Sequence, residues 1–307
     1  MWQRRSYRFA RPVPYDPRES FSLAALGRDP SFQRIPQRGF RCLRWYSGEL
    51  IAYTVGWSDN ALVVALDGLE SAVAQFQEED AKALLGLHDE GRLELSSETR
   101  DPMASYAAHI PGLRLTRLPW PYEGGLQVVL SQRVSWAEAS ANWQRLCRNY
   151  GEFAEEMWSA PSPKRLLGLS MPEFARCGIE EKRAIGLKGI AHALGPLRDF
   201  SRHSGEALQR KLDGLARIGP WTKALLRGQI WGEPDVVPLG DYGLPDLVCR
   251  ALAKERHGND ERMLELLAPY LGQRFRVIRL LWAGSPKGER RGPRLPQGQG
   301  LGPTRPS

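Results

Sequence analysis

The sequence has few cysteines and histidines, which limits the kinds of site that it can build. Its four cysteines lie far apart in 307 residues and form no CxxC pair, so neither a compact zinc site nor a disulfide framework is indicated. Reduced thiols of an intracellular protein are the expectation. Among the five histidines, metal-ligand spacing is absent at His192, His203 and His257. We therefore expect no metal and no cofactor.

Long apolar runs are also missing. No segment reaches the 18 or so apolar residues of a membrane span. The first 17 residues, MWQRRSYRFARPVPYDP, contain arginines but lack the apolar core of a signal peptide. The sequence thus predicts a soluble, cytoplasmic protein with no membrane partner, associated with the nucleoid if the source is bacterial.

Acidic residues are outnumbered by basic ones, 35 to 43, which gives a net charge of +8. An anionic partner, such as nucleic acid or a membrane surface, is favoured by this excess, although many soluble proteins carry a similar charge without one. The content of 42% hydrophobic and 25% charged residues is typical of a globular protein, and the length suggests two domains.

The first part of the chain has the pattern of an antiparallel sheet. Short β-branched and aromatic runs between residues 40 and 66 are broken at Ser47-Gly48 and at 58–60, as in strands joined by turns. Residues 69–87 have helical spacing. Residues 1–18 are either a loose arm or a segment that pairs with something later. The prediction is an N-terminal α/β domain over residues 1–110.

From Leu126 onward the pattern is almost wholly helical, after the turn-like run PWPYEGG at 119–125. Residues 126–151 predict two helices with a polar break at 131–135, and residues 261–284 predict one helix with an apolar side of Leu264, Leu267, Leu271, Phe275, Ile278 and Trp282. The fold class is therefore α+β, with an all-α domain at 111–284 and a disordered basic tail at 285–307.

Residues 212–244, LDGLARIGPWTKALLRGQIWGEPDVVPLGDYGL, predict a helix, a tight glycine hairpin, a second helix and a loop that carries Asp241. Ile218 is expected to pack inward. Gly219 is expected to let the chain turn and to bring backbone N–H groups to the surface, where they form a phosphate site that does not read sequence. An ordinary helix–helix turn remains open on spacing alone.

These residues resemble a known family. LARIGPWTKALL followed by PDVVPLGDYGL is similar to the helix-hairpin-helix DNA glycosylase superfamily, and most closely to its DNA-3-methyladenine glycosylase II branch. The resemblance extends over about residues 111–284. It includes PGLRL, VVLSQRVSWAEA, CGIEEKRAIGLKGIA and the terminal RLLW, in that order. Several weak motifs in the right order form a specific signal together. The N-terminal domain resembles the extra domain of that branch more weakly.

The resemblance implies that Asp241 is the catalytic carboxylate. Cleaving an N-glycosidic bond builds positive charge on the sugar, and a nearby aspartate stabilises that charge or orients water. Asp235 and Asp246 are rivals, but the first suits a loop turn after Pro234 and the second suits the start of a helix.

The same resemblance indicates which group attacks the sugar. In family members that also cut the strand, a lysine occupies the position of Trp221, where it forms a Schiff base; an indole cannot do so. Lys223 is expected on another side of the helix. The iron–sulfur branch carries four clustered cysteines, and this chain has only Cys249 near that region, so no cluster is expected.

The remaining site residues follow from base flipping, in which the target base leaves the duplex and stacks in an aromatic pocket. Such a pocket would favour a cationic alkylated purine. The resemblance implies a pocket of Trp221, Trp282 and Tyr242, a DNA-binding hairpin of Arg217, Ile218, Gly219, Trp221 and Thr222, and a wedge of Gln132 and Arg133. Two positions depart from the family: many relatives have an apolar residue at Arg133, and the usual hairpin has glycine at Arg217.

The predicted function is a monofunctional DNA glycosylase, acting as a monomer on duplex DNA, that removes damaged and chiefly alkylated bases in base excision repair. The alternative is a protein of the same fold that binds damaged or structured DNA without chemistry. A small-molecule enzyme with accidental motifs is the third hypothesis, and it predicts no salt-dependent DNA affinity.

Overall fold

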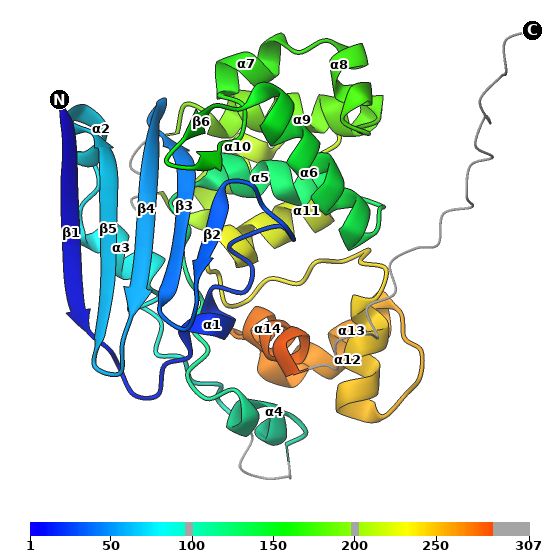
Figure 1. Cartoon of the computed structure of the whole chain (residues 1–307). Coiled ribbons are helices and arrows are strands. Elements are labelled where there is room, and N and C mark those ends of the chain that lie inside the picture. The colour runs from blue at the N-terminus through cyan, green and yellow to red at the C-terminus, as the bar shows by residue number, and fades with distance from the viewer. Residues whose placement is uncertain (96–100, 198–202, 285–307) are drawn as a thin grey trace, which may run out of the picture.

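The computed structural model describes residues 1–95, 101–197 and 203–284. Its first part is an antiparallel sheet in the order β1-β5-β4-β3-β2, which forms one side of the molecule in Figure 1. The strands are β1 (Trp2–Ala10), β2 (Phe32–Ile35), β3 (Gly39–Tyr46), β4 (Glu49–Trp57) and β5 (Ala61–Leu69). The predicted tail at 285–307 lies outside the described residues.

Residues 2–10 form an edge strand, so the second of the two alternatives for the N-terminal segment is the right one. They pair with β5 from Trp2 opposite Leu69 to Ala10 opposite Ala61. Ser47 and Gly48 join β3 to β4 with φ angles of 53° and 84°, the two left-handed positions of a tight hairpin turn.

The helix predicted at 69–87 is two helices, α2 (Glu70–Val73) and α3 (Glu78–Leu84). The interruption has a local cause, because Gln77 and Asp80 form a capping box that starts a new helix. Phe76, which is fully buried, lies in the break and packs edge-on against Tyr53 of the sheet.

The run PWPYEGG begins a helix instead of forming a loop. Pro121 occupies the first turn of α5 (Pro121–Leu130), where its missing N–H costs nothing. Gly124 and Gly125 lie inside α5 because a Cβ there would come within 2.3 Å of Ile230 and 2.6 Å of Ile190. The two glycines serve close helix packing, a role that local sequence does not reveal.

Further helices lie beside the sheet (Figure 1). Those at 136–150, 181–194 and 220–225 pack on α5, and those at 163–168, 171–176 and 205–212 pack on the 181–194 helix. Two two-residue strands, β6 (Phe153–Ala154) and β7 (Met157–Trp158), interrupt the helical part and cover Leu43 on the outer face of the sheet. The remaining helices here are α1 (Pro17–Ser20), α6 (Trp136–Tyr150), α7 (Pro163–Gly168), α8 (Met171–Arg176), α9 (Glu181–Leu194), α10 (Gly205–Leu212) and α11 (Pro220–Leu225), which continues as a π-helical turn (Leu226–Ile230).

A second core lies between α4 (Met103–His109) and three C-terminal helices, α12 (Leu244–Ala253), α13 (Asp260–Leu267) and α14 (Arg274–Gly284). The single helix predicted at 261–284 is therefore two, because the chain breaks at Pro269 and Gly272. Leu271, expected on an apolar side, is 73% exposed in that break. Among the described residues, no helix is long and apolar enough to cross a membrane.

The α+β class is confirmed: an antiparallel sheet precedes a largely helical part that contains two helices joined by a hairpin. The two parts share one hydrophobic core, since the inner face of the sheet, with Tyr53 and Leu66, belongs to the same buried cluster as α5 and α9. The boundary at residue 111 stays a prediction. α4, on the N-terminal side of that boundary, packs on α14.

Candidate functional site

The hairpin runs from the end of α10 at Leu212 to the start of α11 at Pro220. Its left-handed residues are Gly214, with φ 76°, and Arg217, with φ 67°. Gly219 has φ −88°, and a Cβ there would meet nothing within 4 Å. The expectation that Gly219 makes the sharp turn is therefore wrong: positions 214 and 217 carry it, and Arg217 adopts a left-handed conformation that glycine adopts more readily.

Ile218 anchors the hairpin to the helical core and is 6% exposed, as expected. It packs over Gly186 of α9, where an added Cβ would lie 3.7 Å from Ile218 Cδ1 and 3.6 Å from Arg217 Cβ. The Arg217 side chain is exposed, as is Gly219. The hairpin thus presents a cation and backbone groups to solvent from a rigid base.

The loop between α5 and α6, residues 131–135, is tied to the hairpin by Gln132. Its Nε2 donates hydrogen bonds to the backbone oxygen of Arg217 at 3.0 Å and to Thr222 Oγ1 at 2.9 Å. Thr222 is buried, whereas Arg133 is exposed with a left-handed φ of 55°. Of the two predicted wedge residues, Gln132 faces the hairpin and Arg133 projects away from the protein surface.

Trp221 and Asp241 meet, although 20 residues separate them. The indole Nε1 of Trp221 donates a hydrogen bond of 2.8 Å to Asp241 Oδ2. The other carboxylate oxygen, Oδ1, accepts from the backbone N–H groups of Gly243 at 3.0 Å and Leu244 at 2.9 Å, at the start of α12. Three donors thus hold the carboxylate of Asp241 in one orientation at the start of α12.

Asp241 is partly exposed, so its carboxylate can meet a ligand from solvent. Tyr242 is 69% exposed beside it and does not enclose the site. Trp282 of α14 is partly buried and packs edge-to-face on Phe275, with ring centroids 5.9 Å apart. A hydrogen bond joins Trp221 to Asp241, and both Trp221 and Trp282 pack against the main hydrophobic core.

The rival residues have other partners. Asp235 forms a two-point ion pair with Arg274, at 2.6 and 2.9 Å; partial burial would raise the pKa of Asp235, but hydrogen bonds from Arg274 and Gly272 bring it below its usual value. Asp246 accepts from Gly258 N at 2.9 Å and so fixes a loop. Lys223 pairs with Asp213 at 2.5 Å. Since two residues turn a helix by about 200°, Lys223 points away from the Trp221 side.

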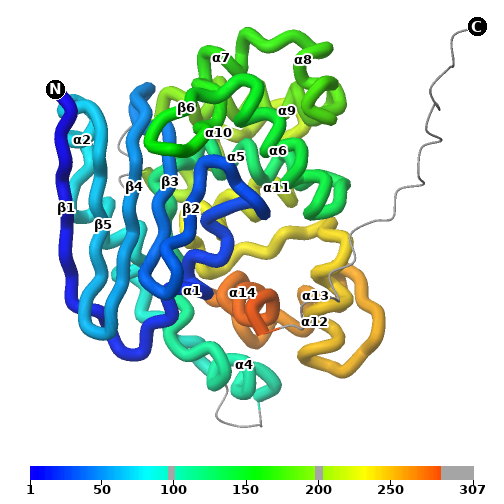
Figure 2. The backbone as a smooth tube through the Cα atoms, viewed as in Figure 1, coloured from blue at the N-terminus to red at the C-terminus, as the bar shows by residue number. Residues whose placement is uncertain are grey.

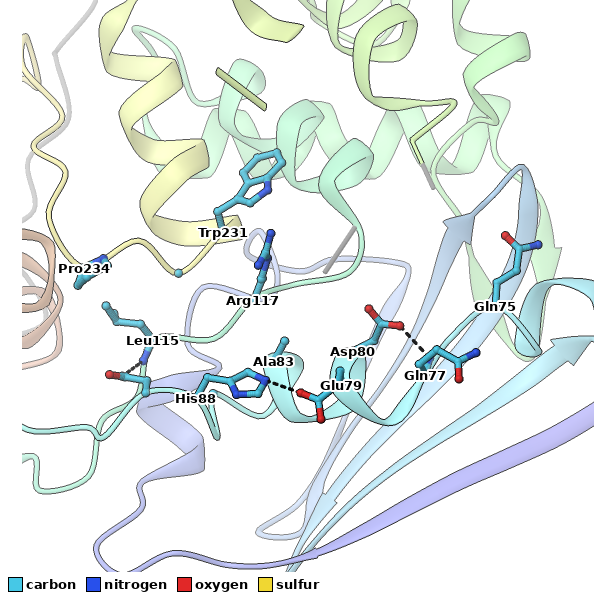
Figure 3. A pocket seen from close by; sticks show the side chains of 13 residues that line it. Gln75, Gln77, Glu79, Asp80, Ala83, His88, Leu115, Arg117, Trp231 and Pro234 are labelled. Carbon is cyan, nitrogen blue, oxygen red and sulfur yellow. Dashed lines mark hydrogen bonds and ion pairs between the residues drawn. The ribbon is translucent and has the colours of Figure 1, made fainter. Parts of the chain in front are cut away.

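Two cavities lie elsewhere. One, of about 500 Å³, opens between α3 and the 231–234 segment; Figure 3 shows Asp80 and Ala83 on one side and Arg117 and Trp231 on the other. The second, of about 360 Å³, lies behind α11 near Lys223. Neither of these two cavities is lined by Trp221 or Asp241, so neither is the predicted base pocket.

Sequence reasoning missed a buried charged cluster next to α5. Arg44 of β3, Asp29 and Glu123 of α5 are each less than a tenth exposed, and Arg44 and Asp29 pair at 3.3 Å. Glu123 Oε1 accepts from Trp45 N at 2.6 Å. Burial raises the pKa of Glu123 to about 7, against the opposing effect of Arg44. The one sequence signal for this cluster is Arg44 itself, a charged residue at a position of β3 whose side chain faces the core.

The helical part contains two helices joined by a hairpin, and comparison with known proteins finds the same arrangement of family and fold. Residues 126–270 match the family described as "HhH-GPD superfamily base excision DNA repair protein". DNA-3-methyladenine glycosylase 2 of Escherichia coli (strain K12) is 31% identical over 137 residues, which are 43% of this chain and 49% of that protein. The resemblance inferred from the sequence motifs is thereby confirmed. The chain spans about half the length of this curated relative.

Solved structures show the same fold over a longer part of the chain. A 3-methyladenine DNA glycosylase from Archaeoglobus fulgidus has a TM-score of 0.70 at 16% identity, covering 90% of this chain and 97% of its own. An 8-oxoguanine glycosylase/lyase of Clostridium acetobutylicum, in complex with double-stranded DNA, has a TM-score of 0.61 at 14% identity, covering 88% and 91%. Because these relatives carry different substrates in their names, the shared fold does not select one.

Proposed function

We propose that the protein is a monofunctional DNA glycosylase that hydrolyses the N-glycosidic bond of damaged, chiefly alkylated, bases in duplex DNA. The observation that carries this proposal is the hydrogen bond of 2.8 Å between Trp221 Nε1 and Asp241 Oδ2. An ionised carboxylate on an accessible surface, held by three donors, is suited to stabilise the positive charge that develops on the sugar.

Water, rather than a protein amine, is the nucleophile in this proposal. The indole of Trp221 stands where strand-cutting relatives have lysine, and the amine of Lys223 is engaged by Asp213. The carboxylate of Asp241 stabilises the positive charge on the sugar as the glycosidic bond breaks, and it orients the attacking water. The base leaves with the bonding electrons and the water oxygen forms the new bond to the sugar carbon. The proton that the water loses passes to solvent when the alkylated base was cationic, and to the departing base when that base was neutral.

A binding protein without chemistry is the second candidate, and one observation favours it. Oδ1 of Asp241 caps the start of α12 through Gly243 N and Leu244 N, a role that an aspartate can have for stability alone. DNA recognition would then depend on the hairpin and the 131–135 loop.

The experiment is single-turnover base release from methylated duplex DNA, followed by mass spectrometry. We expect the wild type to release methylated purines and Asp241→Asn to be at least about a hundredfold slower, the scale of losing one group that stabilises transition-state charge. In Asp241→Asn the amide N–H of the asparagine faces the indole N–H of Trp221, and two donors repel each other. The matched controls remove the indole N–H: they are Trp221→Phe and the double variant Trp221→Phe/Asp241→Asn. Trp221→Phe keeps the carboxylate and is expected to lose only about tenfold.

Three results would contradict the proposal. Unchanged base release by Asp241→Asn removes the role of Asp241. Duplex binding without release of any base from a broad lesion panel favours the binding protein. A covalent complex trapped by borohydride would show an amine nucleophile and so overturn the monofunctional assignment.

A further inference from the structure

The segment that joins α1 to β2 leaves the sheet and lies against the two helices that flank the 131–135 loop (Figure 2). Asp29 fixes it there. One carboxylate oxygen of Asp29 accepts from Trp143 Nε1 of α6 at 2.8 Å, and the other accepts from Gln127 Nε2 of α5 at 3.0 Å and from Arg44. A single buried residue thus binds this segment of the sheet domain to both helices.

Gly27 brings the same segment flush against α6. It has φ 60°, and a Cβ on it would lie 2.3 Å from Ser140 Oγ, so no side chain fits there. Ser140 Oγ also accepts the backbone N–H of Arg28 at 3.2 Å. The backbone on both sides of Arg28 is therefore held in place.

The anchored segment presents Arg28 beside Trp136. The Arg28 side chain is exposed and makes no ion pair among the described residues. Trp136, the first residue of α6, directly follows the 131–135 loop and is 58% exposed; its Nε1 lies 3.5 Å from the position of a Cβ on Gly27. An exposed arginine on an anchored backbone and an exposed tryptophan thus lie next to the loop that carries Arg133.

We propose that Arg28 and Trp136 form a second DNA-contacting patch that continues from the 131–135 loop. The guanidinium of Arg28 binds a backbone phosphate, and the indole of Trp136 stacks on a nucleotide of the duplex next to the flipped base. This inference rests on the proposed function, because it assumes that the 131–135 loop faces DNA. It makes the sheet domain part of the binding surface.

The chemistry of the two side chains fits nucleic acid. An arginine on a fixed backbone donates paired hydrogen bonds to phosphate with little loss of entropy, and it carries no sequence information. A rigid, accessible indole offers a stacking face to any base. Tryptophan and arginine are also the residues most often responsible for the energy of an interface.

The test measures the affinity of the full chain for a 20–25 base-pair duplex with one abasic site, by fluorescence anisotropy, across a sodium chloride series. We expect Arg28→Ala to weaken binding several-fold. The slope of the logarithm of the binding constant against the logarithm of the salt concentration (the salt slope) should fall by about one in this variant, whereas Arg28→Lys should keep it. Trp136→Ala is expected to weaken binding roughly tenfold with the slope unchanged. Arg8→Ala, an exposed arginine on the edge strand β1, is the matched control and is expected to bind like the wild type.

The outcomes separate this inference from the proposed function, since base release is measured on the same proteins. If Arg28→Ala and Trp136→Ala bind as the wild type does, the patch is not a DNA contact, whatever the activity. If both variants weaken binding while the wild type releases no base, the patch stands and the glycosylase proposal fails. A wild type that does not bind duplex DNA overturns both. Thermal unfolding of each variant shows whether a loss of affinity reflects a loss of fold.

Discussion

Arg217 holds a left-handed backbone conformation, φ 67°, that costs a side-chain-bearing residue about 1 kcal/mol or more. Its backbone oxygen is fixed by Gln132, and its side chain is exposed. The resemblance to the glycosylase superfamily implies a glycine at this position. An arginine kept at such a position, on an accessible hairpin, fits a contact between its guanidinium and a DNA phosphate.

Replacing Arg217 separates the backbone effect from the charge effect. Arg217→Ala keeps the left-handed strain, whereas Arg217→Gly removes it but gives the unfolded chain more conformational freedom. We therefore expect the unfolding free energy of Arg217→Gly to be within about 1 kcal/mol of the wild type and no lower than that of Arg217→Ala. Both variants lose the cation, and we expect both to weaken duplex binding equally and to lower the salt slope by about one. Urea unfolding and anisotropy measure the two effects. An unchanged slope in both variants would remove the phosphate contact.

At the scale of elements, Gln132 joins the 131–135 loop to the hairpin, so the two predicted DNA-contacting segments form one rigid unit. Gln132→Ala removes both hydrogen bonds, and we expect a loss of about 1 kcal/mol in unfolding free energy and faster hydrogen exchange at the hairpin amides. Gln144→Ala is the control, since the amide of Gln144 bonds only to Ser140 within α6. Equal exchange in the wild type and Gln132→Ala would show that the two segments are independent.

The elements that sequence predicted well are those with local signals. The polar residues at 131–135 predict a break between two helices, and the structure has that break, with the Ser135 side chain accepting from Glu138 N at the start of α6. Only the family resemblance places Trp221 and Asp241 in one site. Their separation of 20 residues in the sequence does not predict that their side chains are in contact.

The elements that sequence misjudged depend on tertiary contacts. The pair Gly124 and Gly125 suggests a turn in the sequence, yet both residues are helical. They are glycines inside a helix because Ile230 and Ile190 of other elements pack where a Cβ would lie. Leu271 fitted an apolar stripe, although Pro269 and Gly272 stop the helix around it. Asp29 is hydrogen-bonded to Gln127 and Trp143, which lie 98 and 114 positions away in the sequence, and no local pattern predicts such contacts.

At the scale of the whole molecule, the sheet and the helices are joined by buried charge as well as by the shared core. Arg44 is enclosed by Asp29, Ser31 and the Trp120 ring, whose centroid is 5.5 Å from the guanidinium carbon. Glu123 completes the junction from α5. Removing one member of such a group leaves the others buried without compensation, which is costly.

The raised pKa of Glu123 predicts how this junction responds to pH. The carboxyl group titrates near pH 7 in the folded protein and near 4.5 when unfolded, so between these values the folded state holds a proton that the unfolded state has released. The contribution of Glu123 to stability is therefore fully present below about pH 4.5 and falls as pH rises to about 7, by roughly 3 kcal/mol at about 1.4 kcal/mol per unit. Glu123→Gln has no proton to lose.

We therefore expect the unfolding free energy of the wild type to fall relative to that of Glu123→Gln as the pH rises from 5 to 7.5. Above pH 7.5 the difference between the two unfolding free energies should stay constant. Urea unfolding at half-unit pH steps measures it, with Glu181→Gln, an exposed glutamate in the first turn of α9, as a control that is expected to follow the wild type. Parallel curves for the wild type and Glu123→Gln would show that Glu123 is ionised in the fold. The junction would then hold a second buried carboxylate beside Asp29, for which Arg44 is the shared counterion.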